Sequence, residues 1–195
     1  MNRFIIALMI GLLVCGLEGR GVARASDEQA IALAHTRALA QQGDGKAQVD
    51  LGQMYERGTG VTQNFTEAAN WYRRAAEHGL ARAQILLANL YDEGHGVPKD
   101  AWTAVKWLRL AAMQGEAMAQ FELGWHYLDG QGIPQDNIRA HLRFSLAAET
   151  KDHDLSVSAA ETRDFVAAKM TPAELARAQG MARHCKSSRY KSCFF

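Results

Sequence analysis

The feature that most constrains the fold is a repeat of 36 residues, which appears when the sequence is compared with itself. Three consecutive units, 47–82, 83–118 and 119–154, carry the same small, apolar and aromatic residues at matching positions, and a partial unit over 26–46 precedes them. In the first full unit the recurring residues are Ala47, Leu51, Tyr55, Gly58, Gly60, Val61, Ala68, Ala75 and Ala76. Such regularity predicts an array of similar units stacked on one another, not a single domain around one core.

Each unit is predicted to form two helices joined by a glycine turn. In the first unit Ala47, Leu51 and Tyr55 fall on one face of a helix with 3.6 residues per turn. Gly58 ends that helix, because glycine adopts the left-handed backbone of a helix C-terminus at little cost. Helices this short are marginal alone, so each unit depends on its neighbours. The predicted fold class is therefore all-α: an α-solenoid of about three 36-residue helix-turn-helix repeats.

The second helix of every unit is predicted to begin at a polar N-cap. Asn64, Asp100 and Asp136 occupy this position in the three units, and their side chains accept hydrogen bonds from the free N–H groups of a first helical turn. In the first unit Glu67, three residues after the cap, is placed to complete a capping box.

The residues after the repeats, 155–195, are predicted to close the array with a pair of capping helices and a tail. Thr171, Pro172 and Glu174 make a typical helix start, with an N-cap, a proline at the first helical position and a glutamate that completes a capping box. In the third unit Arg143 replaces the tryptophan of the first unit. We interpret this change as the end of the array, since terminal units of solenoids are atypical.

The first 25 residues have the layout of a signal peptide. Arg3 precedes an apolar run over 4–17, and Ala23-Arg24-Ala25 has the small-x-small form of a cleavage site. A membrane anchor is the alternative, but the run is shorter than the roughly 20 residues that span a bilayer. A lipoprotein anchored through Cys15 is less favoured. We therefore expect cleavage after Ala25, a periplasmic or secreted protein, and a mature form that does not enter the membrane.

The mature chain would keep two cysteines, Cys185 and Cys193, close together near the C-terminus. An oxidising compartment lets such a pair form a disulfide, which we expect here. The alternative is a pair of free thiols.

The charge of the chain gives no reason to expect nucleic acid or an anionic membrane as a partner. The formal net charge is +1 at pH 7. Loss of the first 25 residues removes three arginines and one glutamate, which leaves a mature net charge of −1. Neither value produces an extended field of one sign.

A search for catalytic or metal-binding motifs finds two weak matches. Glu122 and His126 are four residues apart, like a metal-ligand pair on a helix, but no second pair lies nearby. Ser188 and Lys191 match the letters of the Ser-x-x-Lys nucleophile motif without its partner motifs. The sequence therefore predicts no catalytic residue, no metal and no cofactor, and a protein that is not an enzyme.

The motifs in 47–61 and 64–79 resemble the Sel-one-like repeat family: Ala-Gln-x-x-Leu-Gly-x-Met-Tyr-x-x-Gly-x-Gly-Val, followed by Asn64 and Trp-Tyr-Arg-Arg-Ala-Ala-Glu-x-Gly. The resemblance implies a tetratricopeptide-type α-solenoid that binds another protein, with a bacterial envelope scaffold or adaptor as the expected role. Cysteine-rich relatives linked to penicillin binding suggest an alternative, a hydrolase of cell-wall or β-lactam substrates. Those relatives carry a cysteine pair in each repeat, which this chain lacks.

In solenoids of this type the first helices line a concave face, and positions that vary between units are where a partner is recognised. Two such columns are predicted to bind the partner protein: Asp50, Leu86 and Glu122, and Gln53, Asn89 and Trp125. Trp125 is either an exposed anchor or a residue packed against the C-terminal helices. Packing is favoured for Trp102. A purely structural spacer remains a third possibility, and the oligomeric state stays open.

Overall fold

The computed structural model describes residues 29–190 and 193, and within that part of the chain every regular element is a helix. The predicted signal peptide lies outside the described residues. Residues 29–41 are helical. The helices that follow are α2 (Gly45–Arg57), α3 (Phe65–Glu77), α4 (Ala81–Glu93), α5 (Ala101–Ala112), α6 (Ala117–Asp129), α7 (Asn137–Ala147), α8 (His153–Ala167) and α9 (Pro172–Ser187). The all-α prediction is confirmed.

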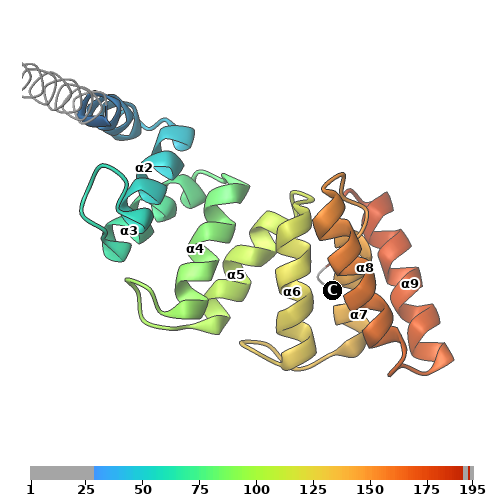
Figure 1. Ribbon diagram of the computed structural model, residues 1–195. Helices are drawn as coiled ribbons and strands as arrows, with labels where there is room; N and C mark the ends of the chain where they lie inside the picture. The colour runs from blue at the N-terminus through green and yellow to red at the C-terminus, as the bar shows by residue number, and fades with distance from the viewer. Residues whose placement is uncertain (1–28, 191–192, 194–195) are drawn as a thin grey trace, which may run out of the picture.

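The helices follow one another from one end of the molecule to the other, as the colour gradient of Figure 1 shows. The main packing joins consecutive helices from α2 to α8, and α9 packs back on α7. The pairs α2–α3, α4–α5 and α6–α7 correspond to the three predicted units. Contacts that run only between neighbours define a solenoid, in which each unit completes the core of the next.

The turns follow the predicted chemistry. Gly58, Gly94 and Gly130 end α2, α4 and α6 with φ of 71°, 76° and 71°. Later in the turn, a Cβ on Gly96 would lie 2.2 Å from the backbone carbon of Phe65, so only glycine allows this approach between units.

The predicted N-caps are confirmed. The side chains of Asn64, Asp100 and Asp136 each accept a main-chain N–H in the first turn of α3, α5 and α7. In α3 the cap bond from Glu67 N–H is made, but the reciprocal half of a capping box is not seen. Among the described helices that have a recorded N-cap, α9 makes the full box, through Thr171 and Glu174.

A buried glutamine attaches the first helix of each unit to the helix before it. Gln48, Gln84 and Gln120 are spaced by 36 residues and are at most 4% exposed. Each side-chain amide donates to the main-chain carbonyl eight residues earlier, at 3.2, 3.1 and 2.8 Å respectively. For Gln84 and Gln120 the acceptors are in the last turns of α3 and α5. The amide oxygens of Gln84 and Gln120 also accept hydrogen bonds, from Gln114 and Arg143. These two contacts fix the angle between units, because few other arrangements would satisfy a buried amide.

Small and large residues are matched across the two helices of a unit. Gly124 on α6 faces Phe144 on α7, and a Cβ at Gly124 would lie 2.5 Å from the phenylalanine Cε1. Gly52 faces Tyr72 in the same way, at 2.4 Å. In the middle unit the equivalent residues are alanine and leucine, Ala88 and Leu108, which share one core cluster. The combined volume of the two facing side chains is thus roughly the same in each unit, as close packing requires.

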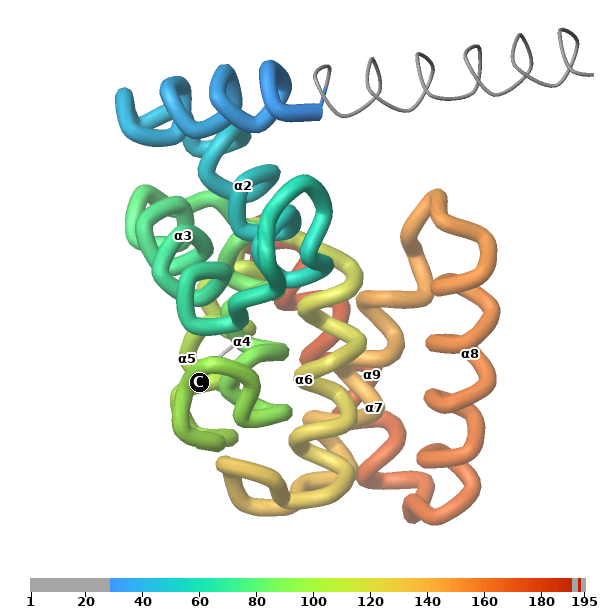
Figure 2. Tube along the Cα trace, turned by 60° about the vertical axis from the view of Figure 1, so that its left-hand side comes forward, coloured from blue at the N-terminus to red at the C-terminus, as the bar shows by residue number. Residues whose placement is uncertain are grey.

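The C-terminal pair closes the array as predicted. Helix α7 packs against both α8 and α9 (Figure 2). Cys185 on α9 and Cys193 form the predicted disulfide, which joins Leu142 and Leu146 of α7 in a small apolar cluster. The end of the chain is therefore held on the last repeat.

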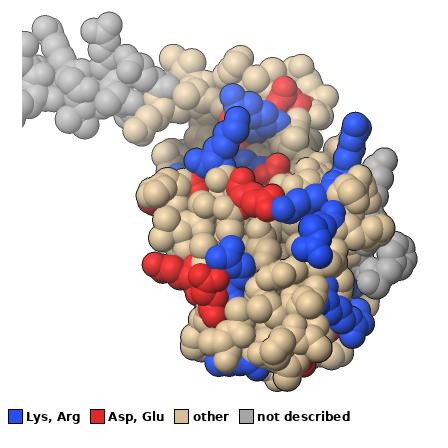
Figure 3. Space-filling view, turned by 90° about the vertical axis from the view of Figure 1, so that its right-hand side faces the viewer, with Lys and Arg blue, Asp and Glu red and all other residues tan. Residues whose placement is uncertain are grey.

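Charged side chains are interspersed over the end of the molecule that carries the C-terminal helices (Figure 3). Acidic and basic groups occur there in small clusters separated by uncharged surface. This distribution agrees with the near-neutral net charge of the sequence. None of the described helices is long and apolar enough to cross a membrane.

The matching of Gly124 with Phe144 predicts a compensating pair of substitutions. Gly124→Ala forces the phenylalanine ring to move and should lower the free energy of unfolding by about 1–3 kcal/mol. Adding Phe144→Leu recreates the alanine and leucine of the middle unit, so the double variant should be at least about 1 kcal/mol more stable than the sum of the single effects. Urea denaturation of the four proteins measures this coupling.

Gly180→Ala in α9 is the matched control. An added Cβ there meets only the end of the Arg183 side chain, at 3.9 Å. This variant should gain up to about 1 kcal/mol, because alanine favours a helix interior more than glycine does. Additive effects of Gly124→Ala and Phe144→Leu would contradict the packing argument.

Candidate functional site

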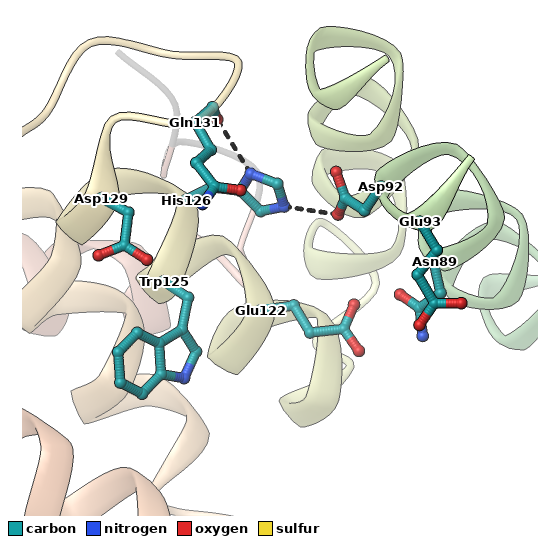
Figure 4. Close-up of a pocket in the computed structure, with 8 residues that line it drawn as sticks. All are labelled: Asn89, Asp92, Glu93, Glu122, Trp125, His126, Asp129 and Gln131. Carbon is teal, nitrogen blue, oxygen red and sulfur yellow. Dashed lines mark hydrogen bonds and ion pairs between the residues drawn. The ribbon is translucent and has the colours of Figure 1, made fainter. Parts of the chain in front are cut away.

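The candidate site is a hollow between α4 and α6, the first helices of the second and third units, which we call the α4–α6 groove. Its volume is about 350 Å³, and it opens to the surface. Figure 4 shows side chains of the two helices facing one another across it. The lining residues are Asn89, Asp92, Glu93, Glu122, Trp125, His126, Asp129 and Gln131.

The groove brings together three of the six residues predicted to bind a partner: Asn89, Glu122 and Trp125. Asp50 lies in a separate hollow near the starts of α2 and α4, lined also by Lys46 and Arg82. The remaining two are half-buried outside the groove: Leu86 packs on the apolar core between α3 and α4, and Gln53 lies on α2. Three of the six predicted residues thus line the groove, and the other three lie outside it.

A buried histidine links the two walls of the groove. His126 on α6 donates from Nε2 to Oδ2 of Asp92 on α4, at 2.9 Å, and from Nδ1 to the carbonyl oxygen of Gln131, also at 2.9 Å (Figure 4). Because a carboxylate and a carbonyl both accept, both ring nitrogens donate and the ring is an imidazolium. Burial acts to lower the pKa of His126, but the hydrogen bonds and the nearby carboxylates outweigh it, so the pKa is raised.

From the sequence, His126 was considered as half of a weak metal-ligand pair with Glu122, and Asp92 was not identified. The bond to Asp92 crosses 34 residues and joins two units. The two residues occupy different positions in their repeats, since Asp92 follows Tyr91 whereas His126 precedes Tyr127. No repeated position carries the signal, because the residue one repeat before His126 is Leu90 and the residue one repeat after Asp92 is Leu128.

Glu122 is the second polar residue of the groove that is largely removed from water. Burial raises its pKa to about 7, the proximity of Asp92 adds to this effect, and Asn89 and His126 oppose it. With the Asn89 amide nitrogen turned toward Glu122, it donates to Oε2 at 3.0 Å. Glu122 therefore changes its charge near neutral pH, and the charge of the groove changes with it.

Trp125 is partly exposed, and the rings it packs against lie on α6 and α7 and not on the C-terminal helices. Its indole is 40% exposed at the groove. It also packs edge to face against Phe121 and Phe144, with ring centroids 6.2 and 5.7 Å away. The contact that orients Trp125 is thus with α6 and α7, not with α8 or α9. The ring is thus held in place on one side and exposed on the other.

The packing predicted for Trp102 is wrong. The side chain is 59% exposed at the start of α5, with the Lys106 ammonium 3.7 Å from its ring centroid. The position lies in the first turn of α5, beside the N-cap Asp100, and the side chain extends into solvent although the turn of the next unit approaches the backbone at Ala101 and Trp102.

The two weak motifs gain no support from the geometry. In the described part of the chain no group of three or more His, Cys, Asp or Glu side chains is arranged to hold a metal ion. Ser188 follows α9, and its hydroxyl donates to the carbonyl oxygen of Cys185 at 2.8 Å. Lys191, the other residue of that motif, lies outside the described residues.

The fold and the groove define the class of protein: a helical repeat protein with a recessed surface between first helices. The Sel1 repeat model matches residues 7–44, 45–80, 81–116 and 117–149, so the chain belongs to the Sel1 repeat family. The first of these four matches, 7–44, covers most of the region that we predicted as a partial unit, 26–46. It begins within the predicted signal peptide. Repeats of this family are generally protein–protein interaction modules.

Two solved structures are similar to this chain. One is c5321, a protective antigen of uropathogenic Escherichia coli strains with an SLR fold: it is 30% identical over 82% of this chain, with a TM-score of 0.73. The chain spans only 34% of that protein's length. The other is a Sel1 repeat protein from Oxalobacter formigenes, 35% identical over 67% of this chain and 98% of its own, with a TM-score of 0.59. No curated protein matches the chain.

The raised pKa of Glu122 predicts a pH-dependent stability. A carboxyl whose pKa is higher in the folded than in the unfolded state stabilises the fold while protonated, and this stabilisation is lost as the pH rises from about 4.5 to about 7. Glu122→Gln resembles the protonated form at every pH. The variant should exceed the parent in free energy of unfolding by about 1–3 kcal/mol at about pH 8 and match it near pH 4.

Glu93→Gln is the control for this measurement. Glu93 lines the same groove but is exposed and paired with His95 at 2.8 Å. Its pH profile should run parallel to that of the parent. A gain for Glu122→Gln that is the same at both pH values would contradict the assigned desolvation.

Proposed function

We propose that the protein is an exported scaffold or adaptor that binds a segment of a partner protein in the α4–α6 groove. The observation that carries this proposal is Trp125, a large aromatic side chain exposed in a recess and fixed by two other rings. Tryptophan is prominent among the residues that dominate binding energy at protein interfaces. Because its neighbours already hold the ring, little side-chain entropy is lost on binding.

The walls of the groove support the same assignment. The bond between His126 and Asp92 fixes α6 against α4, so the recess keeps its shape without a partner. Recesses that are already formed on rigid elements before the ligand arrives are typical of binding sites. Trp102 is more exposed than Trp125, but it lies on a helix start outside the groove and its ring already contacts Lys106. It is therefore the weaker candidate.

Export is part of the proposal. Two observations support it. Residues 1–25 have a basic residue, an apolar run and a small-x-small cleavage site in the order of a signal peptide, and Cys185 and Cys193 form a disulfide. Disulfides persist in the periplasm and outside the cell and are rare in a reducing cytosol. A role in the bacterial cell envelope follows from this location, with the mature protein in the periplasm or secreted.

Site-specific photo-crosslinking in the native host tests this function. A photoreactive phenylalanine replaces Trp125 in one variant and Trp102 in a matched control, since both positions carry exposed tryptophans on different helices. We expect one dominant partner protein to be linked from position 125 and not from position 102. Trp125→Ala should reduce co-purification of that partner at least about tenfold, the loss expected for an aromatic anchor.

Circular dichroism and thermal melting of each variant check that the fold is retained. Mass spectrometry of the same samples also determines whether residues 1–25 have been removed. Equal capture from both positions, or none from position 125 in a folded variant, would overturn the assignment of the groove.

A further inference from the structure

The face of α6 that lines the groove combines one aromatic ring with two carboxyl groups. Glu122, Trp125 and Asp129 are spaced at i, i+3 and i+7, which places them on one side of a helix. Figure 4 shows the three side chains together on α6, opposite Asp92 and Glu93 of α4. At the equivalent places the first unit has Asp, Gln and Arg and the second has Leu, Asn and Glu. This acidic and aromatic face is therefore specific to the third unit.

The groove has a strong excess of acidic groups. Four carboxylates line it, against the one imidazolium of His126, and no lysine or arginine is among the lining residues. A recess lined by one sign of charge concentrates the field and attracts ligands of the other sign. The net charge of the whole chain is close to zero, so the local excess is not a consequence of composition.

Other aromatic rings of this molecule already contact a cation. The Arg74 guanidinium lies 4.5 Å from the Trp71 ring centroid, and the Lys106 ammonium lies 3.7 Å from that of Trp102. A third ring, Phe165, has the Lys169 ammonium at 3.9 Å. Among the described residues no such cation is recorded over Trp125, although its ring is exposed and has carboxylates on both sides along α6.

We propose that the α4–α6 groove binds a cationic side chain of the partner protein, arginine in preference to lysine, with the cation against the Trp125 ring and beside Glu122 and Asp129. The inference rests on the proposed function and names the chemistry of its partner. Arginine fits better because its flat guanidinium stacks on an aromatic face while its edge donates to carboxylates. A volume of about 350 Å³ is at the small end for ligand sites, which suits one long side chain inserted from a segment.

A titration with short peptides tests the chemistry without knowledge of the partner. The indole N–H signals of the four tryptophans are followed by NMR while acetyl-Gly-Arg-Gly-amide is added up to about 20 mM, since a single cation–π and ionic contact gives millimolar binding. We expect a saturating shift of the Trp125 signal, assigned with Trp125→Phe. The matched peptide carries citrulline, which has nearly the same shape without the charge, and should bind at least about tenfold more weakly.

A charge-matched pair of variants assigns the effect to the groove. Glu122→Gln with Asp129→Asn should weaken the arginine peptide about tenfold without loss of thermal stability. Glu77→Gln with Glu161→Gln removes the same number of carboxyl groups, both of them exposed, from α3 and α8 and should leave the affinity unchanged. A Trp125 response that is equal for arginine and citrulline, or larger for a leucine peptide, would overturn the inference and indicate a neutral or apolar occupant.

The two proposals fail in different ways. If position 125 captures a dominant partner but the arginine peptide shows no selectivity, the cationic assignment is wrong and the scaffold function stands. If the peptide selectivity is found and position 125 captures no partner, the groove recognises a cation but the proposed scaffold function is wrong.

Discussion

Each unit is attached to the one before it by a buried glutamine amide, and the geometry of the groove depends on that contact. Gln84 and Gln120 donate to the last carbonyls of α3 and α5, so they determine how α4 and α6 start relative to the preceding unit. The two walls of the α4–α6 groove thus have a defined separation before any side chain of the groove is considered. The bond between His126 and Asp92 then joins these walls near their other ends. In a solenoid each repeat contacts only the repeats next to it. The shape of the groove therefore depends on the glutamine bonds at one end of α4 and α6 and on the bond between His126 and Asp92 at the other.

The hydrogen bond that the glutamine oxygen accepts differs between the second unit and the third, which is the last repeat. The Oε1 atom of Gln84 accepts from Gln114, whereas that of Gln120 accepts from Arg143 at 2.9 Å. Arg143 is completely buried and also donates to the carbonyl oxygen of Cys193 at 2.7 Å. Burial lowers its pKa to about 10, so it stays charged at neutral pH. A buried charge is tolerated when it is hydrogen-bonded, and here it links the last repeat to the tail held by the disulfide.

Most of the fold could be predicted from the sequence, and much of the site could not. The repeat period, Asn64 as an N-cap and the capping box of Thr171 are local or periodic patterns, which a single sequence displays directly. The groove depends on which side chains meet across units. Glu122 and Trp125 were found because they vary within a column, but Asp92 was missed since its partner is 34 residues away. Trp102 was misjudged because exposure depends on how much of the next unit covers a helix start, and periodicity does not contain that information.

The central claim is that α4 and α6 form the surface that recognises a partner, with Trp125 as its anchor. The most direct measurement is a crystal structure of the protein with the segment of the partner that is captured at position 125. Our account predicts that this segment lies between α4 and α6, with an arginine or lysine side chain against the indole and within hydrogen-bond distance of Glu122 or Asp129. A segment bound across α3 and α5, with the groove empty, would contradict it.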